Sequence, residues 1–268
     1  MKKLSIFLAA IIMVAACAHK EKPFFIQVSD PQLGFINFSE DFSPEVPLMG
    51  KMVEKINTLN PEFVVFTGDL VHWRTNTAAL DAFDSLTSLI NENITVYYLP
   101  GNHDVGNEAL KEDVDKFVQR YGSDRFVHRS KEYTVIGFNS SVVKAQTKAE
   151  GAEYEWLREQ LQNADPKKPI IVAAHYPIFV KTPDEEETYE NLPIPMREKY
   201  MALFEEYGVD TYIAGHQHLC IRLEHNGIDY IIASALGRQL GQDKSGYTTI
   251  TIDGEKPQVV YTPIEETI

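Results

Sequence analysis

The chain has 268 residues, 44% of them hydrophobic, and shows no linker or low-complexity tract, so one large domain with a substantial core accounts for its length. Its formal net charge of −14 makes nucleic acid a poor partner, because a surface of this sign repels phosphate backbones. The sequence contains no internal repeat, glycine-rich phosphate loop, Gly-x-Ser-x-Gly segment or Cys-x-x-Cys pair, which excludes the functions that those motifs signal.

Residues 1–16 have the pattern of a signal peptide. Lys2 and Lys3 precede an apolar run that ends at Ala16, and this run is too short to cross a membrane, which needs roughly 20 residues. The segment Val-Ala-Ala-Cys that ends at Cys17 resembles a bacterial lipobox, which implies cleavage before Cys17 and attachment of lipid to it. We therefore expect an exported lipoprotein of the bacterial cell envelope, held on a membrane only through its lipid anchor. The alternative is an ordinary signal peptide with a free cysteine.

Removal of residues 1–16 would take away two lysines and no acidic residue, which changes the formal charge from −14 to −16. Cys220 would then be the one unmodified cysteine, so no intrachain disulfide is expected. Cys220 lies just before Ile221 at the start of a predicted strand, and we expect it to be a buried core thiol.

The domain is expected to occupy residues 24–268, and its first part alternates short apolar strands with helical patterns. The strands are predicted at 24–29, 62–67 and 94–99, and the helices near 45–59, 77–91 and 107–121. This alternation is typical of βαβ units and a largely parallel sheet. Right-handed crossovers would bring the three strand ends, with Asp30, Asp69 and Asn102, to one edge of the sheet.

The remainder of the chain has a different pattern. Strands are predicted near 125–128, 132–138 and 169–174, with a helix near 151–163. Five further strands are predicted at 209–214, 219–224, 227–233, 246–252 and 257–263. Turns such as Asn226-Gly227 separate these five strands, and we expect them to pair in antiparallel fashion. A mixed α/β sandwich therefore fits better than a single doubly wound sheet.

Polar segments follow several of the predicted strands. They are Ser-Asp-Pro-Gln at 29–32, Gly-Asp at 68–69, Gly-Asn-His-Asp at 101–104, His175, and Gly-His-Gln-His at 215–218. Taken singly, such residues are usually helix caps, turn formers or core histidines. Taken together they indicate a site for two metal ions about 3.5–4 Å apart, which can activate water and clamp a phosphate ester. Asp69 is the natural bridging carboxylate, and a turn must bring His216 and His218 into one site.

The order of these segments resembles that of the calcineurin-like metallophosphoesterase superfamily. The resemblance implies a four-layer α/β/β/α sandwich of two mixed sheets that binds two divalent or trivalent ions, Mn, Fe or Zn. It implies that Asp30, Asp69 and His218 hold the first ion and that Asp69, Asn102, His175 and His216 hold the second. His103 would be the catalytic residue, which stabilises charge or protonates the leaving oxygen while a metal-bound hydroxide attacks phosphorus.

One position departs from the superfamily pattern. Gln32 stands where the first motif carries a histidine, and an amide offers a cation only its carbonyl oxygen. His72 follows the bridging Asp69 by three residues, at a place where related purple acid phosphatases carry a metal-binding tyrosine. We expect His72 to replace the missing ligand, or else to lie behind the ligands or contact the substrate.

A closer resemblance covers nearly the whole exported chain. It rests on Asp-Pro-Gln at 30–32, Gly-Asp-Leu-Val-His at 68–72, Gly-Asn-His-Asp-Val-Gly-Asn at 101–107 and Ser-Ala-Leu-Gly at 234–237. These segments resemble the calcineurin-like phosphoesterase domain-containing protein 1 group, which includes an animal protein serine/threonine phosphatase. The resemblance implies that the pairing of Gln32 with His72 is a trait of this group.

The expected activity is hydrolysis of phosphomonoesters, on proteins or on small molecules. The alternatives are a phosphodiesterase or nucleotide hydrolase and, from another class, a surface binding module weakened by Gln32. Arg74 and Arg238 are candidate phosphate-binding residues, although a solvated arginine is the commoner outcome. Asp184 to Glu187 and Glu190 are expected to overhang the substrate entrance, or else to form a solvated acidic loop. The sequence does not define the oligomeric state.

Overall fold

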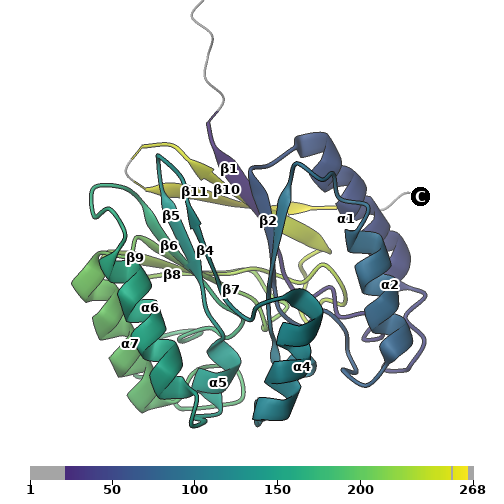
Figure 1. The fold of residues 1–268 in the computed structure, drawn as a ribbon, viewed down its shortest axis with the longest axis horizontal. Coiled ribbons are helices and arrows are strands. Elements are labelled where there is room, and N and C mark those ends of the chain that lie inside the picture. Colours follow the sequence, from purple (N-terminus) through teal and green to yellow (C-terminus); the bar gives the residue numbers. More distant parts are fainter. Residues whose placement is uncertain (1–21, 255, 265–268) are drawn as a thin grey trace, which may run out of the picture.

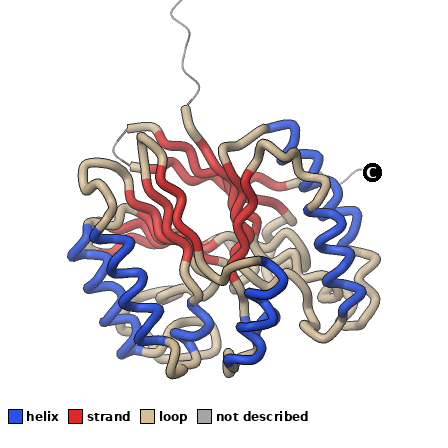
Figure 2. The backbone as a smooth tube through the Cα atoms, in the orientation of Figure 1, coloured by secondary structure: helices blue, strands red, loops and turns tan. Residues whose placement is uncertain are grey.

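The computed structural model describes residues 22–254 and 256–264 (Figures 1 and 2). The signal peptide predicted at residues 1–16 and the lipidation site predicted at Cys17 lie outside the described residues. Within the described part, no helix is both long enough and apolar enough to cross a membrane.

The first sheet has five strands in the order β11-β10-β1-β2-β3. Its strands are β1 (Phe24–Val28), β2 (Phe63–Thr67), β3 (Thr95–Leu99), β10 (Gly246–Ile252) and β11 (Pro257–Pro263). β1, β2 and β3 are parallel neighbours, with Val64 beside both Ile26 and Val96, as the alternation of strands and helices predicts. β10 and β11 extend the sheet in antiparallel fashion.

The second sheet has six strands in the order β4-β5-β6-β7-β9-β8. Its strands are β4 (Phe126–Arg129), β5 (Thr134–Gly137), β6 (Ile170–Ala173), β7 (Thr211–Ala214), β8 (Ile221–His225) and β9 (Ile228–Ile232). The prediction of antiparallel pairing after residue 209 is wrong for β7, because Ile213 lies in parallel register between Ala173 and Ile231. The chain leaves β7 for the edge strand β8 and returns through a hairpin, so the partner of β7 is not the next strand in sequence.

The helices are α1 (Glu45–Leu59), α2 (Thr77–Thr87), α3 (Asn102–Val105), α4 (Lys111–Tyr121), α5 (Ser140–Lys144), α6 (Glu150–Gln162) and α7 (Ile194–Tyr207). The helix predicted near 107–121 begins only at Lys111, as α4, and the separate short helix α3 precedes it. Gly106 separates them, since its φ of +77° is outside the helical range. As a result Asn102 and His103 form the first turn of a short helix directly after β3.

The core confirms the four-layer sandwich. Successive residues of β2 alternate between two hydrophobic clusters, with Phe63 and Val65 in one and Val64 and Phe66 in the other. The smaller cluster contains side chains from both sheets and fills the space between them, and Phe25 stacks there on Phe63 at 4.5 Å. The larger cluster lies under the helices, and Figure 1 shows α1 and α2 beside the first sheet and α6 and α7 beside the second. The inner strands of each sheet are thus covered on both faces.

A polar contact joins the two sheets near the ends of their parallel strands. The Gln27 side chain donates to the Thr67 hydroxyl at 3.1 Å and to the Ala214 carbonyl oxygen at 2.9 Å, so it links β1 and β2 to β7. In the low-dielectric interior this contact is strong and directional. It fixes how the ends of the two sheets meet.

The prediction that Cys220 is a buried core thiol is wrong. Cys220 is exposed, and its backbone N–H donates to the Asp243 carboxylate at 2.7 Å. It precedes the edge strand β8, along which side chains are only half-buried or exposed. An apolar-looking strand at the edge of a sheet does not cover its flanking residues as a central strand does.

Candidate metal centre

Six polar residues from both sheets meet at the carboxyl ends of the parallel strands. Asp30, Asp69 and Asn102 follow β1, β2 and β3, while His175 follows β6, and His216 and His218 follow β7. All six are buried. The first three therefore follow three neighbouring parallel strands of one sheet, and the other sheet supplies the histidines.

The geometry divides these residues into two groups that share one carboxylate. Ligand atoms of Asp69, His175 and His216 all lie within 4.8 Å of one another, and so do those of Asp30, Asp69 and His218. Asp69 alone belongs to both groups. This is the arrangement that the sequence predicts for a bridging carboxylate.

Each of the three histidines has one ring nitrogen committed to a backbone carbonyl. His175 Nδ1 lies 2.9 Å from the Thr67 oxygen, His216 Nε2 lies 3.3 Å from the Tyr189 oxygen, and His218 Nδ1 lies 2.5 Å from the Arg238 oxygen. Because a carbonyl oxygen only accepts, these nitrogens carry the protons. In the neutral form of each ring the other nitrogen presents a lone pair to the centre, as in metal-binding histidines.

The lone pairs face other acceptors at short range. His175 Nε2 lies 3.2 Å from His216 Nδ1, 3.1 Å from Asn102 Oδ1 and 3.5 Å from Asp69 Oδ1. Asp30 Oδ1, 3.4 Å from His218 Nε2, is buried without any hydrogen-bond partner. A buried cluster of acceptors is unfavourable unless a cation lies among them. Nitrogen and carboxylate donors of this kind suit Mn, Fe or Zn, so the residues present fit the expected pair of ions.

Two groups of the site have the protonation state of a metal ligand. Burial and the adjacent His175 lower the pKa of His216 well below its usual value, which keeps that imidazole neutral. Burial alone would raise the pKa of Asp30, but His218, His175 and the Ser29 hydroxyl outweigh burial and hold the pKa below the usual range. A neutral imidazole and an ionised carboxylate are the forms that bind a cation. Burial alone would lower the pKa of His218, but Asp30 outweighs burial and raises it, so the His218 ring loses a proton when it binds a cation.

The backbone at the ligands is strained. Five residues of the site have positive φ, namely Asp30 (48°), Gln32 (39°), Asp69 (52°), His216 (73°) and His218 (51°). This conformation lets His216 and His218 leave β7 in a turn, so that both reach the site, as expected from their spacing. Gly215 makes the approach possible, because a Cβ there would lie 2.0 Å from the Ser29 hydroxyl and 2.6 Å from Asp30 Oδ2.

Asp104 is a residue of the site to which the sequence analysis assigned no role. Its carboxylate accepts hydrogen bonds from the backbone N–H groups of Asp69 (2.7 Å), Leu70 (3.0 Å) and Gly101 (2.8 Å). It thereby ties the turn after β2 to the turn after β3. Its place as the fourth residue of Gly-Asn-His-Asp could have indicated a cap of the short α3.

His103 lies beside the two groups and not within either of them. Its backbone N–H donates to Asp69 Oδ1 at 2.9 Å, and its Nδ1 lies 2.7 Å from the His72 carbonyl oxygen. With Nδ1 committed as a donor, Nε2 is the nitrogen free to exchange a proton. His103 also lines an open cavity of about 250 Å³ whose wall includes Trp73, Arg74, Asn102 and Tyr189.

Gln32 and His72 lie next to each other beside the first group. The Gln32 amide nitrogen is 3.3 Å from His72 Nδ1, while Gln32 Oε1 and His72 Nε2 are buried with no hydrogen-bond partner. Rotating the amide by 180° would let Oε1 accept from His72 Nδ1–H and free the Nε2 lone pair for an ion. Burial and the neighbouring His103 lower the pKa of His72 to about 4, so the ring is neutral, as a ligand requires.

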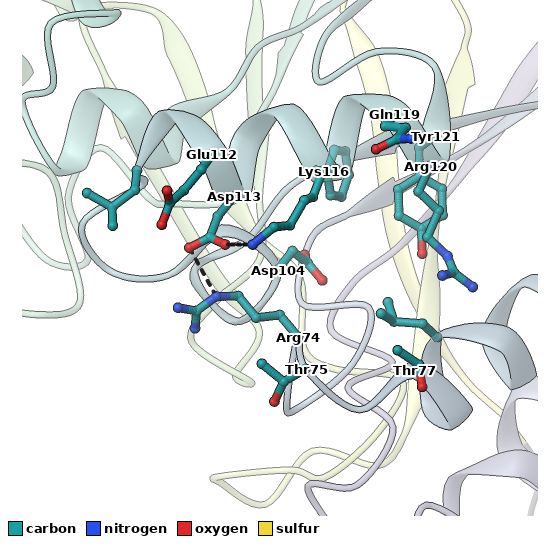
Figure 3. Close-up of a pocket in the computed structure, with 13 residues that line it drawn as sticks. Arg74, Thr75, Thr77, Asp104, Glu112, Asp113, Lys116, Gln119, Arg120 and Tyr121 are labelled. Atoms are coloured by element: carbon teal, nitrogen blue, oxygen red, sulfur yellow. Dashed lines mark hydrogen bonds and ion pairs between the residues drawn. The ribbon is translucent and has the colours of Figure 1, made fainter.

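The two candidate phosphate-binding arginines contact different residues around the site. Arg74 Nε lies 3.3 Å from Asp113 Oδ2, and Figure 3 shows this contact in a neighbouring cavity of about 590 Å³ along α4. Because Arg74 also lines the His103 cavity, its guanidinium stands between the two hollows. The Arg238 guanidinium lies over the Phe35 and Phe38 rings, at 5.3 and 4.5 Å from their centroids.

The fold and the site together define a class of α/β proteins with two sheets, in which two groups of candidate metal ligands share one aspartate. The sequence profile described as "Calcineurin-like phosphoesterase" matches residues 25–220. The chain belongs to the calcineurin-like phosphoesterase family, and its activity is the metal-dependent hydrolysis of phosphate esters.

Curated proteins are similar in sequence to this chain over most of their own length. A Danio rerio protein named serine/threonine-protein phosphatase CPPED1 is 31% identical over 85% of this chain and 81% of its own. The Homo sapiens protein of the same name is 30% identical over 91% and 84%.

Solved structures support the fold. A dimetal phosphatase from Danio rerio superposes with a TM-score of 0.68 at 11% identity, covering 90% of this chain and 99% of that chain. A purple acid phosphatase from yellow lupin gives a TM-score of 0.61 at 14% identity, covering 85% and 49%.

The roles of Asp69 and His103 are separable by substitution. Asp69→Asn should lose at least one ion per chain and lower kcat by more than the roughly 10–100-fold that an outer partner costs, because an amide supplies one good oxygen and no charge. His103→Gln should retain both ions and lower kcat by roughly 10²–10⁴-fold. Metal analysis and initial rates on the same samples test both. A metal-replete, active Asp69→Asn protein would refute the bridge, and metal loss in His103→Gln would make His103 a ligand.

A second prediction concerns His72. His72→Ala should weaken binding of one ion, and addition of Gln32→His should partly restore it, since an imidazole then returns to the position that the superfamily uses. Titration with a competing chelator measures the dissociation constant of each ion. Unchanged affinity in His72→Ala would limit His72 to a role behind the ligands.

Proposed function

We propose that the chain is a phosphomonoesterase that acts on single phosphate groups displayed on protein or peptide side chains. The observation that carries the proposal is the charge of the His103 cavity. Arg74 is the one lysine or arginine among the described residues that line it, and Glu108 lies in the same wall. One guanidinium suits one phosphoryl group, whereas a polyphosphate would require more positive charge.

The exposure of the cavity supports a macromolecular substrate. Trp73 and Tyr189 are 46% and 54% exposed although both line the cavity, so the entrance lies at the surface of the protein. A phosphorylated side chain can therefore enter the cavity while the backbone of the substrate protein stays outside. The relatives named serine/threonine-protein phosphatases, at about 30% identity over most of both chains, agree with this substrate class.

The residues of the site have distinct roles in this reaction. Asp30, Asp69 and His218 would hold one ion, and Asp69, Asn102, His175 and His216 the other. When bound, the two ions supply a nucleophile at neutral pH and neutralise charge on the phosphoryl oxygens.

His103 provides the proton for the leaving group. The His72 carbonyl fixes Nδ1–H and so orients the ring, which leaves Nε2–H of the protonated form to donate to the departing oxygen. Asp69 holds the His103 backbone N–H, so the acid and the metal centre keep a constant separation.

Metal-loaded protein lacking residues 1–16 should hydrolyse a phosphoserine peptide with a higher kcat/KM than a phosphodiester or a nucleoside triphosphate. Phosphate release from the three substrates at equal ionic strength is the measurement. A preference for the diester or the triphosphate would overturn the proposal in favour of a phosphodiesterase or a nucleotide hydrolase. The absence of turnover on all three would favour a binding module.

We also propose that the enzyme acts at a membrane surface of the cell envelope, attached through lipid on Cys17. The support is the lipobox-like segment that follows the apolar run of residues 4–16. Cys17→Ala should abolish acyl labelling and move the protein from the membrane fraction to the soluble fraction. Labelled, membrane-bound Cys17→Ala protein would remove the anchor from the proposal.

A further inference from the structure

The segment 181–192, called here the strap, passes over the metal centre, and hydrogen bonds from Arg197 and Lys144 hold its backbone in place. Arg197 is 1% exposed, and its guanidinium donates to the carbonyl oxygens of Pro183, Glu185, Glu186 and Leu192. Lys144 Nζ donates to the carbonyl oxygens of Thr188 and Asn191 at 2.5 and 2.7 Å. A loop with so many backbone contacts holds its side chains in fixed positions.

The acidic residues of the strap do not all face solvent. The Glu185 carboxylate accepts from the backbone N–H groups of Val180 (2.8 Å), Lys181 (2.7 Å) and Thr182 (3.2 Å), so it shapes the strap. The acidic run predicted to overhang the entrance is therefore partly structural. The residue that the strap brings over the centre is Tyr189.

Tyr189 contacts two candidate ligands from different layers of the fold. Its ring lies 4.9 Å from the His216 ring, and its carbonyl oxygen is 3.3 Å from His216 Nε2. Its hydroxyl oxygen is 2.7 Å from Asn102 Nδ2. Tyr189 thus lies against the second group of ligands and lines the His103 cavity.

The hydrogen-bond roles at Asn102 follow from its position. An amide that binds a cation must present its oxygen, and Asn102 Oδ1 faces the lone pair of His175 Nε2 at 3.1 Å. Asn102 Nδ2 must then donate to the Tyr189 hydroxyl oxygen. The phenolic hydrogen consequently points away from Asn102, and no acceptor for it is recorded among the described residues.

We propose that the Tyr189 hydroxyl is a substrate-binding donor that contacts a phosphoryl oxygen in the His103 cavity, with Asn102 setting its direction. The inference rests on the proposed function, since it assigns a residue to the same site. A neutral donor complements the single Arg74 cation without adding charge, which favours a monoester dianion over a polyanion. Tyr189 is then a catalytic residue that no strand-end motif contains.

The test is Tyr189→Phe, with Tyr207→Phe as the matched control. The phenylalanine keeps the ring beside His216 and the backbone carbonyl, and it removes only the hydroxyl. Tyr207 ends α7 and lies near the start of β7, at the opposite end of that strand from Gly215. We expect metal-saturated Tyr189→Phe to bind inorganic phosphate roughly 10-fold or more weakly, the loss typical of a hydrogen bond to a charged group. Tyr207→Phe should bind it as the unmodified protein does.

Calorimetric titration with inorganic phosphate measures this affinity without turnover, so it gives a result even if phosphomonoesters are not the substrates. The ion content and melting temperature of Tyr189→Phe should equal those of the unmodified protein, because water can replace the hydroxyl beside Asn102. Unchanged phosphate affinity would overturn the proposal. Loss of an ion in Tyr189→Phe would also overturn it, since Tyr189 would then act through Asn102 alone.

Discussion

The structure depends on one constraint, that the carboxylate of Asp69 must be reached from both sheets at once. Asp69 ends a central strand of the first sheet, and His175 and His216 end central strands of the second, so only a face-to-face stack with coincident carboxyl ends brings them together. The Gln27 side chain sets this alignment from inside the sandwich. The result is a buried cluster of acceptors that requires cations.

The cost of this cluster appears in the backbone. Five site residues in left-handed conformations cost on the order of 1–3 kcal/mol each, and they persist because the surrounding contacts determine them. Asp104 supplies three such contacts, since it holds the turns after β2 and β3 together. Gly215 supplies the space that any side chain would fill. Five further non-glycine residues with positive φ, Phe38, Asn60, Ala109, Gln146 and Asn226, lie outside the ligand set, so the site carries half of the left-handed residues of this kind in the described chain.

Substrate choice falls to residues outside the ligand set. The two groups of metal ligands suit the hydrolysis of any phosphate ester, whereas the residues that line the cavity select which ester binds. Arg74 is shared between the His103 cavity and the hollow along α4, where Asp113 holds part of its guanidinium. The strap is anchored to α7 through Arg197 and to α5 through Lys144. It adds the neutral phenol of Tyr189 to the wall of the His103 cavity, beside Asn102. A cavity in which Arg74 is the one lysine or arginine among the described residues of the wall is suited to a single phosphoryl group.

The sequence by itself determined the parallel strands, the family and the identity of the polar residues at the strand ends. It could do so because apolar runs and turn-forming polar clusters are local signals, and Asp69 and Asn102 follow their strands directly. It could not determine the parallel pairing of β7, the exposure of Cys220 or the roles of Asp104 and Tyr189. Each of these depends on what lies opposite in space: β9 and not β8 is the partner of β7, an edge strand leaves Cys220 uncovered, and Asn102 meets Tyr189 across 87 residues of chain. Tertiary packing alone sets such long-range contacts, because no local pattern records which side chain a loop will carry over a site.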